Sequence, residues 1–309
     1  MKKIITYLLI VCFINTSTAK TTNKIDNLKT TEDVIKFAKS INPDFAKENV
    51  GELQIKPTDI IIKELKNCDL YKSWNIQNWQ KIDLNNDGKT DLLFTAYWYS
   101  TYSQYAIVET DSNKFTLLSL SHDIDYACKI IKPIVVNNKN ELLVNNHKTD
   151  IESIETEKTI HFLDTLTYKF DSFIEISNKN TNYDIESIKY ISDNNFEIEI
   201  NKDQDASYNC LDSLSFSNMK GHFFKGQSRK KIDKAYFNTI KKLLEYINVR
   251  DLSNEYTLKD AFDFSTVWLE IKFKDGSIKK IKDYGYQGTY GLKAVYDKMT
   301  KIAKETKWD

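Results

Sequence analysis

Residues 265–284 read STVWLEIKFKDGSIKKIKDY, and this stretch contains the strongest fold signal in the chain. Apolar residues occupy every second position of its first half, at Val267, Leu269, Ile271 and Phe273. Such alternation is typical of a strand that is buried on one face, and the Asp275-Gly276 pair that follows favours a tight reversal. The stretch therefore predicts a β-hairpin.

Amphipathic helices are predicted on both sides of this hairpin. The run KKIDKAYFNTIKKLLEYI (230–247) and the last eighteen or so residues repeat apolar side chains at helical spacing. The apolar positions are Ile232, Tyr236, Ile240, Leu243, Leu244 and Ile247 upstream, and Leu292, Val295, Tyr296, Met299 and Ile302 downstream. Such helices pack on one face of a small antiparallel sheet. With a strand pair expected in SLSFSNMKGHFFKG (213–226), we predict an α+β domain at residues 207–309.

The same region carries a resemblance to a known family. LEIKFKDGSIKKIKDYGYQGTYGLKAVYDKMTKIAKETKW (269–308), with the upstream helix and LSNEYT (252–257), resembles a bacterial domain of unknown function that occurs in exported proteins and lipoproteins. The D-Y-G-x-x-G-T-x-x-L run at 283–292 is its most specific part. The resemblance implies a fold and a compartment, and no activity. Because that run lacks the glycine and lysine spacing of phosphate-binding loops, we interpret it as a tight turn.

The preceding residues, 20–206, predict one helix followed by antiparallel strands. TTEDVIKFAKSI (30–41) offers Thr30 or Thr31 as an N-cap, and Pro43 ends the helix. Beyond Ile60 apolar residues tend to alternate, as in QYAIVET, KPIVVNN, ELLVNN, KTIHFLDTLTYKF and NFEIEI. No fixed repeat period is present, so a complete propeller or solenoid is not expected. The whole chain is predicted to be α+β.

The first nineteen residues predict a secretory signal peptide. Lys2 and Lys3 precede an apolar run at 4–14, and small residues lead to a cleavage site after Ala19. Lipid attachment at Cys12 is disfavoured because bulky Val11 precedes it. The run is shorter than the roughly 20 residues that span a bilayer, and no later segment is as apolar. We expect an exported protein, periplasmic or extracellular, with no integral membrane segment in the mature chain.

Charge and cysteine content constrain the partners. The chain has 44 basic and 44 acidic residues, and cleavage would remove two lysines. This balance argues against nucleic acid or an anionic membrane as the partner. Cys68, Cys128 and Cys210 remain in the mature chain, and two of the three can pair in an oxidising compartment. The sequence leaves the pairing open.

KIDLNNDGKTDLLF (81–94) spaces oxygen-bearing side chains as calcium requires. Asp83, Asn85 and Asp87 alternate, Gly88 permits a sharp bend, and Asp91 closes the set. Calcium takes six to eight oxygen ligands, so a chain that curls round the ion can direct these side chains inward. An EF-hand is rejected because its twelfth position, normally a bidentate Glu, is occupied by Phe94.

The D-x-N-x-D-G-x-x-D pattern of this loop resembles the calcium loop of integrin-type FG-GAP and VCBS repeats in secreted β-rich proteins. The resemblance implies that calcium is held by the side chains of Asp83, Asn85, Asp87 and Asp91 and by the Lys89 carbonyl. We expect one structural calcium ion, because three carboxylates within nine residues would repel without a cation. The alternative is a hairpin turn, which Asn-Asp-Gly also favours.

The densest aromatic cluster lies in FTAYWYSTYSQYAIV (94–108). Rings displayed on one sheet face would suit carbohydrate, whereas aromatic residues in strands more often pack in a core. Because successive residues point to opposite faces, we predict core packing.

No catalytic motif is evident. His122, His147, His161 and His222 are scattered, and the consecutive Ser121-His122-Asp123 cannot form a triad from one strand. We therefore predict a non-catalytic binding or envelope-associated protein with an unidentified ligand or protein partner. The alternative is a secreted or periplasmic hydrolase with unidentified acidic residues. An enzyme should show perturbed acids in a deep cleft, and a binding module a shallow exposed patch.

Overall fold

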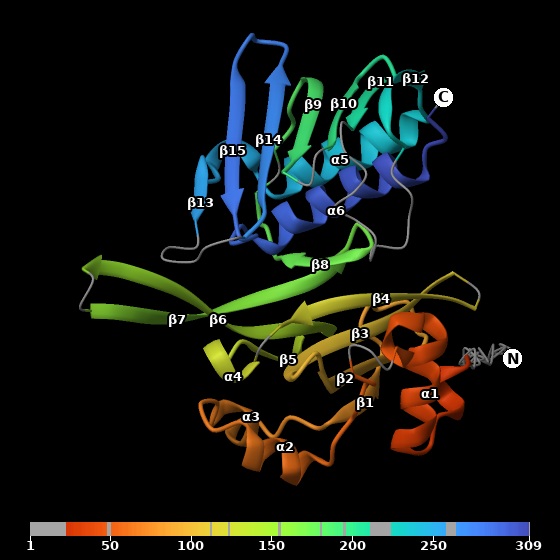
Figure 1. Ribbon diagram of the computed structural model, residues 1–309, viewed down its shortest axis with the longest axis vertical. Coiled ribbons are helices and arrows are strands. Elements are labelled where there is room, and N and C mark those ends of the chain that lie inside the picture. The colour runs from red at the N-terminus through yellow and green to blue at the C-terminus, as the bar shows by residue number, and fades with distance from the viewer. Residues whose placement is uncertain are drawn as a thin grey trace, which may run out of the picture.

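The chain folds as a mixed α+β protein, and the residues that the structure describes form three sheets (Figure 1). The computed structural model describes residues 23–47, 51–111, 113–122, 124–153, 156–179, 181–193, 196–210, 224–257 and 264–308. The predicted signal peptide at 1–19 and most of the strand pair expected at 213–226 lie outside these ranges.

The predicted N-terminal helix is confirmed as α1 (Thr31–Ile41). The Thr30 side chain accepts a hydrogen bond from the Asp33 amide, and the Asp33 carboxylate accepts one from the Thr30 amide. This capping box satisfies two amides that the first turn leaves without helical partners. The short helices that accompany α1 are η1 (Ile25–Asn27), η2 (Pro43–Ala46), α2 (Thr58–Glu64), α3 (Leu70–Ser73) and α4 (Ile124–Ala127).

Two four-stranded antiparallel sheets follow, each with its strands in chain order. The first contains β1 (Trp79–Ile82), β2 (Asp91–Trp98), β3 (Thr101–Asp111) and β4 (Lys114–Ser121). The second contains β5 (Ile130–Val136), β6 (Lys139–Ser153), β7 (Thr156–Lys169) and β8 (Ser172–Glu175). One face of the first sheet packs on α1, and Leu93, Ala106 and Val108 on the other face join a core with the second sheet.

A disulfide joins Cys68 to Cys128 across a sequence separation of 60 residues. It lies in an apolar cluster that links α2 and α3 to β3 and β5 through Ile61, Tyr71, Tyr102 and Ile130. The third cysteine, Cys210, is buried in another core. The structure thus resolves the pairing that the sequence left open.

The C-terminal sheet has seven strands in the order β12-β11-β10-β9-β14-β15-β13. Their bounds are β9 (Ile185–Ser192), β10 (Phe196–Asn201), β11 (Asp205–Cys210), β12 (Gly226–Lys231), β13 (Glu255–Thr257), β14 (Thr266–Phe273) and β15 (Ile278–Tyr284). The predicted hairpin is β14-β15, with Gly276 at φ +82° in its turn. Strand β13 pairs with β15 in parallel, so the sheet is mixed and not purely antiparallel.

This sheet begins at Ile185, so the boundary predicted at residue 206 falls inside β11. Apolar and polar residues alternate in β9 to β11 as they do in the earlier strands. Such alternation does not indicate which sheet a strand joins.

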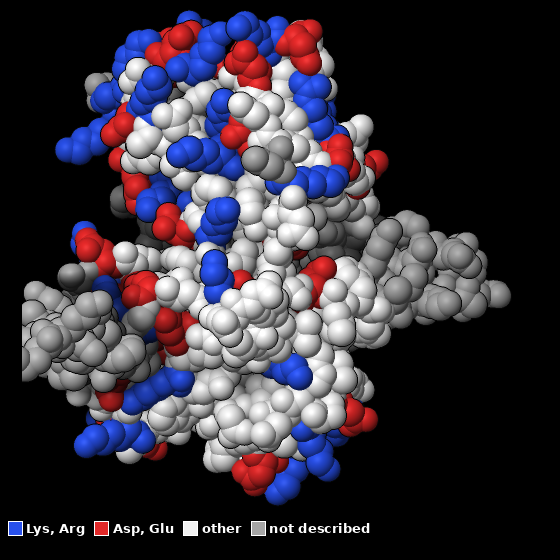
Figure 2. Space-filling view, turned by 180° about the vertical axis from the view of Figure 1, so that it is seen from behind, with Lys and Arg blue, Asp and Glu red and all other residues white. Residues whose placement is uncertain are grey.

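Helices α5 (Lys234–Tyr246) and α6 (Tyr290–Glu305) share one core with the inward side chains of the seven-stranded sheet (Figure 1). On the opposite face, charges of opposite sign face each other across strands: Glu270 pairs in register with Lys189 of β9 and Lys280 of β15. Figure 2 shows basic and acidic side chains interspersed over this upper part of the molecule. Within the described ranges, no helix has the length and apolar character needed to span a membrane.

Candidate functional site

The acidic loop connects β1 to β2 and is closed by its own side chains. Asn86 and Gly88 have positive φ values of +59° and +86°, which reverse the chain. Asp83 accepts hydrogen bonds from the amides of Asp87 at 3.1 Å and Gly88 at 2.8 Å. Asp87 accepts one from the Lys89 amide at 2.9 Å. The exposed carboxylates of Asp83 and Asp87 therefore stabilise the conformation of the turn.

Asn85 and Asp91 connect this loop to β3. The Asn85 oxygen accepts from the Asp87 amide at 3.0 Å, and its amide group donates to the Glu109 carbonyl at 3.2 Å. Asp91 is fully buried, and its carboxylate accepts from the amides of Leu84 at 2.8 Å, Asn85 at 3.3 Å and Glu109 at 3.0 Å. Burial raises the pKa of Asp91 to about 7 against the effect of these amides.

The five predicted calcium ligands therefore occupy two environments. Asp83, Asn85 and Asp87 surround the exposed turn together with the Lys89 backbone, while Asp91 is directed into the protein. Across the described residues, no group of three or more His, Cys, Asp or Glu side chains is arranged to hold a metal ion. The exposed oxygens fit a calcium ion only in combination with amide, carbonyl and water oxygens.

The D-Y-G-x-x-G-T-x-x-L run forms the tight turn between β15 and α6. Buried Asp283 accepts hydrogen bonds from the amides of Gln287 at 2.7 Å and Gly288 at 2.9 Å, and the Thr289 hydroxyl caps α6 through the Leu292 amide. A Cβ atom at Gly288 would lie 2.6 Å from the Asp283 carboxylate. Glycine is therefore required by the close approach of the carboxylate, which the sequence pattern alone does not reveal.

The N-terminal amides of α6 bind an internal carboxylate. Glu175, the last residue of β8, accepts hydrogen bonds from the amides of Tyr290 at 2.6 Å and Gly291 at 2.9 Å. The Tyr290 hydroxyl donates to the Leu120 carbonyl of β4 at 3.3 Å. The two amides thus attach α6 to the second N-terminal sheet in place of an anion such as phosphate, and the Tyr290 hydroxyl attaches it to the first.

Two lysines converge on the Tyr290 ring. The Lys129 ammonium lies 4.7 Å from the ring centroid and the Lys293 ammonium 5.7 Å from it. Neither ammonium forms a hydrogen bond or an ion pair with a described residue. Burial, and then the charge of Lys293, lower the pKa of Lys129 to about 7. Burial likewise lowers the pKa of Lys293.

Histidines that are scattered in the sequence lie beside these lysines. His122 shares a 2.8 Å hydrogen bond with Ser119, and partial burial and then the charges of Lys293 and Lys129 lower its pKa. Burial and then Lys129 lower the pKa of His147, whose Nδ1 atom is buried with no partner among the described residues. His161 faces His147 in the β6-β7 register. His222 and Asp123 lie outside the described ranges.

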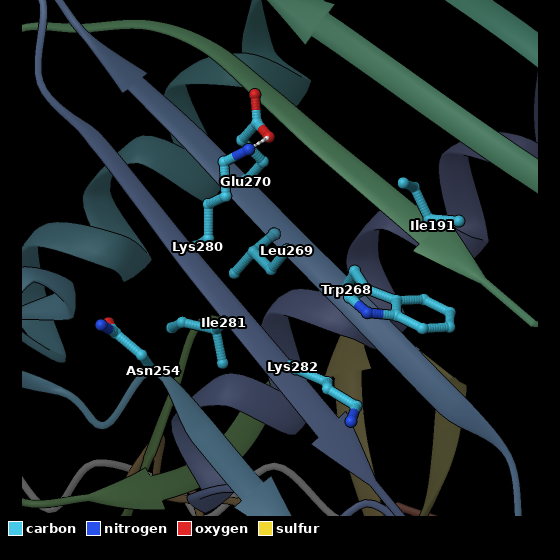
Figure 3. Close-up of a pocket in the computed structure, with 8 residues that line it drawn as sticks. All are labelled: Ile191, Asn254, Trp268, Leu269, Glu270, Lys280, Ile281 and Lys282. Carbon is cyan, nitrogen blue, oxygen red and sulfur yellow. Dashed lines mark ion pairs between the residues drawn. The ribbon is translucent and has the colours of Figure 1, made fainter.

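A shallow pocket of about 600 Å³ lies on the open face of the seven-stranded sheet (Figure 3). Ile191, Trp268 and Lys282 are in register across β9, β14 and β15, and Trp268 is 38% exposed. The remaining lining residues are Asn254, Leu269, Glu270, Lys280 and Ile281. Lys280 pairs with Glu270 at 3.0 Å. Sequence reasoning missed this pocket, although the polar face of the predicted hairpin contains a tryptophan.

The aromatic cluster at 94–108 packs mainly as predicted. Tyr102 and Tyr105 are buried, Tyr97 contacts Tyr102, and Trp98 lies against Phe45 with 4.8 Å between ring centroids. Tyr99 alone among the tyrosines and tryptophan of this cluster is largely exposed, at 55%.

Comparisons with known proteins identify one part of the chain. No curated protein and no solved structure matches it. No comparison supports the FG-GAP resemblance of the acidic loop. Residues 194–303, which extend from β10 into α6, match the family model described as a domain of unknown function, DUF6438, and they form a DUF6438 domain of this protein.

Proposed function

We propose that this chain is an exported, non-catalytic binding protein whose ligand lies in the pocket around Trp268. The observation behind the proposal is a large, partly exposed aromatic side chain that lines a shallow, largely apolar pocket. Ile191 is in register with Trp268, while the side chains of Leu269 and Ile281 are buried in the core with α5 and α6. Exposed tryptophans surrounded by polar groups are typical of recognition surfaces, because the ring offers much apolar area at little entropic cost.

The groups around Trp268 favour a ligand with one flat apolar face and polar edges. Asn254, Lys282 and the Glu270-Lys280 ion pair line the same pocket, with Asn254 and the two lysines on the β15 side of Trp268, and they offer hydrogen-bond donors and acceptors (Figure 3). A pyranose ring has this chemistry, since its C–H face can stack on an indole while its hydroxyls bond to the surrounding groups. We therefore propose a saccharide as the ligand.

Binding is favoured over hydrolysis by the positions of the acids. Asp91 and Asp283 have raised pKa values, caused first by burial, but both carboxylates hold backbone amides away from the pocket. Among the described residues, Glu270 is the one acid that lines the pocket, and it is paired with Lys280. Glycoside hydrolysis ordinarily requires two carboxyl groups about 5–10 Å apart. The hydrolase alternative predicts shortened products after incubation with oligosaccharides.

The proposal is tested by calorimetric titration of the mature protein with a panel of soluble oligosaccharides. At least one should bind, and Trp268→Ala should abolish the heat. Tyr99→Ala is the control, because it removes another exposed aromatic residue outside the pocket. Absence of binding across the panel, or binding that Trp268→Ala leaves intact, would contradict a saccharide site at Trp268. Product formation that Glu270→Gln abolishes would support the hydrolase instead.

We further propose that the acidic loop binds one structural calcium ion through Asp83, Asn85, Asp87 and the Lys89 carbonyl, with Asp91 fixing the loop from inside. The exposed acids and the bend at Gly88 support this assignment. Calcium titration by calorimetry should give a single site that Asp83→Ala and Asp87→Ala each remove. The melting temperature of the wild type should fall in chelator. A loop that is only a turn would show neither effect.

Export is proposed from the residues at 1–19. Expression of the full chain in a bacterial host should yield protein outside the cytoplasm, with an N-terminus at Lys20 by mass spectrometry. Full-length protein retained in the cytoplasm would contradict this proposal.

A further inference from the structure

We infer that Lys129 and Lys293 form a binding site for a doubly charged oxyanion of the phosphate or sulfate class, at the junction of β4, β5 and α6. The site is separate from the pocket at Trp268 and from the acidic loop, and it does not depend on the function proposed above.

The first argument is the rigid placement of the two ammonium groups. Both lie within 6 Å of the Tyr290 ring centroid, at 4.7 and 5.7 Å. The ring is fixed at both ends, because its hydroxyl donates to the Leu120 carbonyl and its backbone amide donates to Glu175. The backbone beside Lys129 is also held, since the adjacent Cys128 is disulfide-bonded and its carbonyl accepts from Asn145 at 2.8 Å.

The second argument is the missing counter-charge. Four acids attract these lysines from beyond ion-pair distance. Glu175 binds two amides of α6, Asp283 binds two amides of its turn, and Asp164 accepts from the Asn146 side chain at 3.0 Å. The fourth, Asp297, follows Lys293 by four residues on α6. No described carboxylate lies within ion-pair distance of either ammonium. Two partly buried cations without a counter-ion are costly, and a bound dianion would offset that cost. Burial is the first cause of the lowered pKa values of both lysines.

The third argument is the set of neighbouring donors. His122 and His147 are both close enough for the lysine charges to lower their pKa values. The buried Nδ1 atom of His147 has no partner among the described residues. Each lysine ammonium offers donors and no acceptors, and each neutral imidazole offers one further N–H donor, which matches an oxyanion as the ligand of this cluster.

The experiment compares sulfate and phosphate with chloride at constant pH and ionic strength. The melting temperature of the wild type should rise with sulfate or phosphate concentration and then level off as a site saturates. Lys129→Met and Lys293→Met should each lose this increase. Lys169→Met is the matched control, because Lys169 lies 4.1 Å from the centroid of the Tyr246 ring without a second lysine on that ring. It should respond as the wild type does.

Calorimetry with inorganic phosphate and with phenyl phosphate then distinguishes a free anion from a phosphoryl group on a larger ligand. Tighter binding of the ester would indicate a site open to larger ligands. If a methionine variant does not fold, Lys129→Arg and Lys293→Arg serve instead, and they should keep the response because they keep the charge. An equal melting temperature in sulfate and chloride for the wild type would overturn the inference. So would an equal response in the wild type and both methionine variants.

Discussion

The carboxylate of Glu175 accepts a hydrogen bond from the amide of Gly291 at 2.9 Å, although 116 residues separate the two in sequence. This contact joins the last strand of the second N-terminal sheet to the first turn of α6. A Cβ atom at Gly291 would lie 2.4 Å from the side chain of Ile247, which follows α5, so glycine is needed where α6 passes the end of α5. The most distinctive run of the C-terminal domain therefore serves, at its end, as a docking element.

Glu175→Ala should lower the free energy of unfolding by about 2 kcal/mol, because it leaves two amides at the start of α6 without their acceptor. Urea unfolding followed by circular dichroism measures the change. Glu186→Ala is the control, since Glu186 is solvent-accessible and forms a surface ion pair with Lys202. Equal stability of both variants would show that Glu175 does not stabilise the junction.

Replacement of both Cys68 and Cys128 by serine should lower the free energy of unfolding by about 4 kcal/mol, because the disulfide closes a loop of 60 residues that the unfolded chain otherwise explores. Guanidinium unfolding of the wild type with and without a thiol reductant provides the comparison. The reductant should destabilise the wild type and leave the double variant unchanged. A wild type that is indifferent to reductant would contradict the pairing.

Asp91→Ala and Asp87→Ala should differ in how much they lower the free energy of unfolding when a chelator has removed calcium. The first substitution leaves two buried amides and one partly buried amide without an acceptor, so we expect a loss of about 3 kcal/mol in the free energy of unfolding with or without calcium. The second removes an exposed acid and should act mainly when calcium is present. Chemical unfolding of both variants in calcium and in EGTA tests the distinction. Similar losses for both variants in EGTA would be inconsistent with a separate internal role for Asp91.

Stability should increase between pH 7 and pH 10.5 through Lys129. The folded protein releases this proton near pH 7 and the unfolded chain near its ordinary pKa of 10.5, so the unfolded state binds more protons in that interval. Below pH 7 both states are protonated, and the cost of the buried charge is fully present.

The increase in the free energy of unfolding caused by Lys129 has an upper limit of about 1.4 kcal/mol per pH unit, because a single proton is involved. Urea unfolding at several pH values in chloride, for the wild type and for Lys129→Met, isolates the effect because other groups titrate equally in both. The stability advantage of Lys129→Met should shrink as pH rises. A pH-independent difference would show that Lys129 titrates normally.

The sequence by itself predicted those elements that are determined by residues close together in the chain. The capping box at Thr30, the alternation of β14 and the Asp275-Gly276 turn each depend on residues within a few positions of one another. The bend of the acidic loop at Gly88 likewise depends on neighbouring residues. Side-chain periodicity and turn chemistry act over this range, so no tertiary contact was needed to infer them.

Contacts between distant residues followed only from packing. The choice of Cys68 and Cys128 as partners, the place of β9 in the C-terminal sheet and the inward orientation of Asp91 have no local signal. The gathering of Lys129, Lys293 and the histidines around Tyr290 likewise required three elements to meet. Periodicity states which face of a segment is apolar, whereas the identity of the segment against which that face packs is set by the core as a whole.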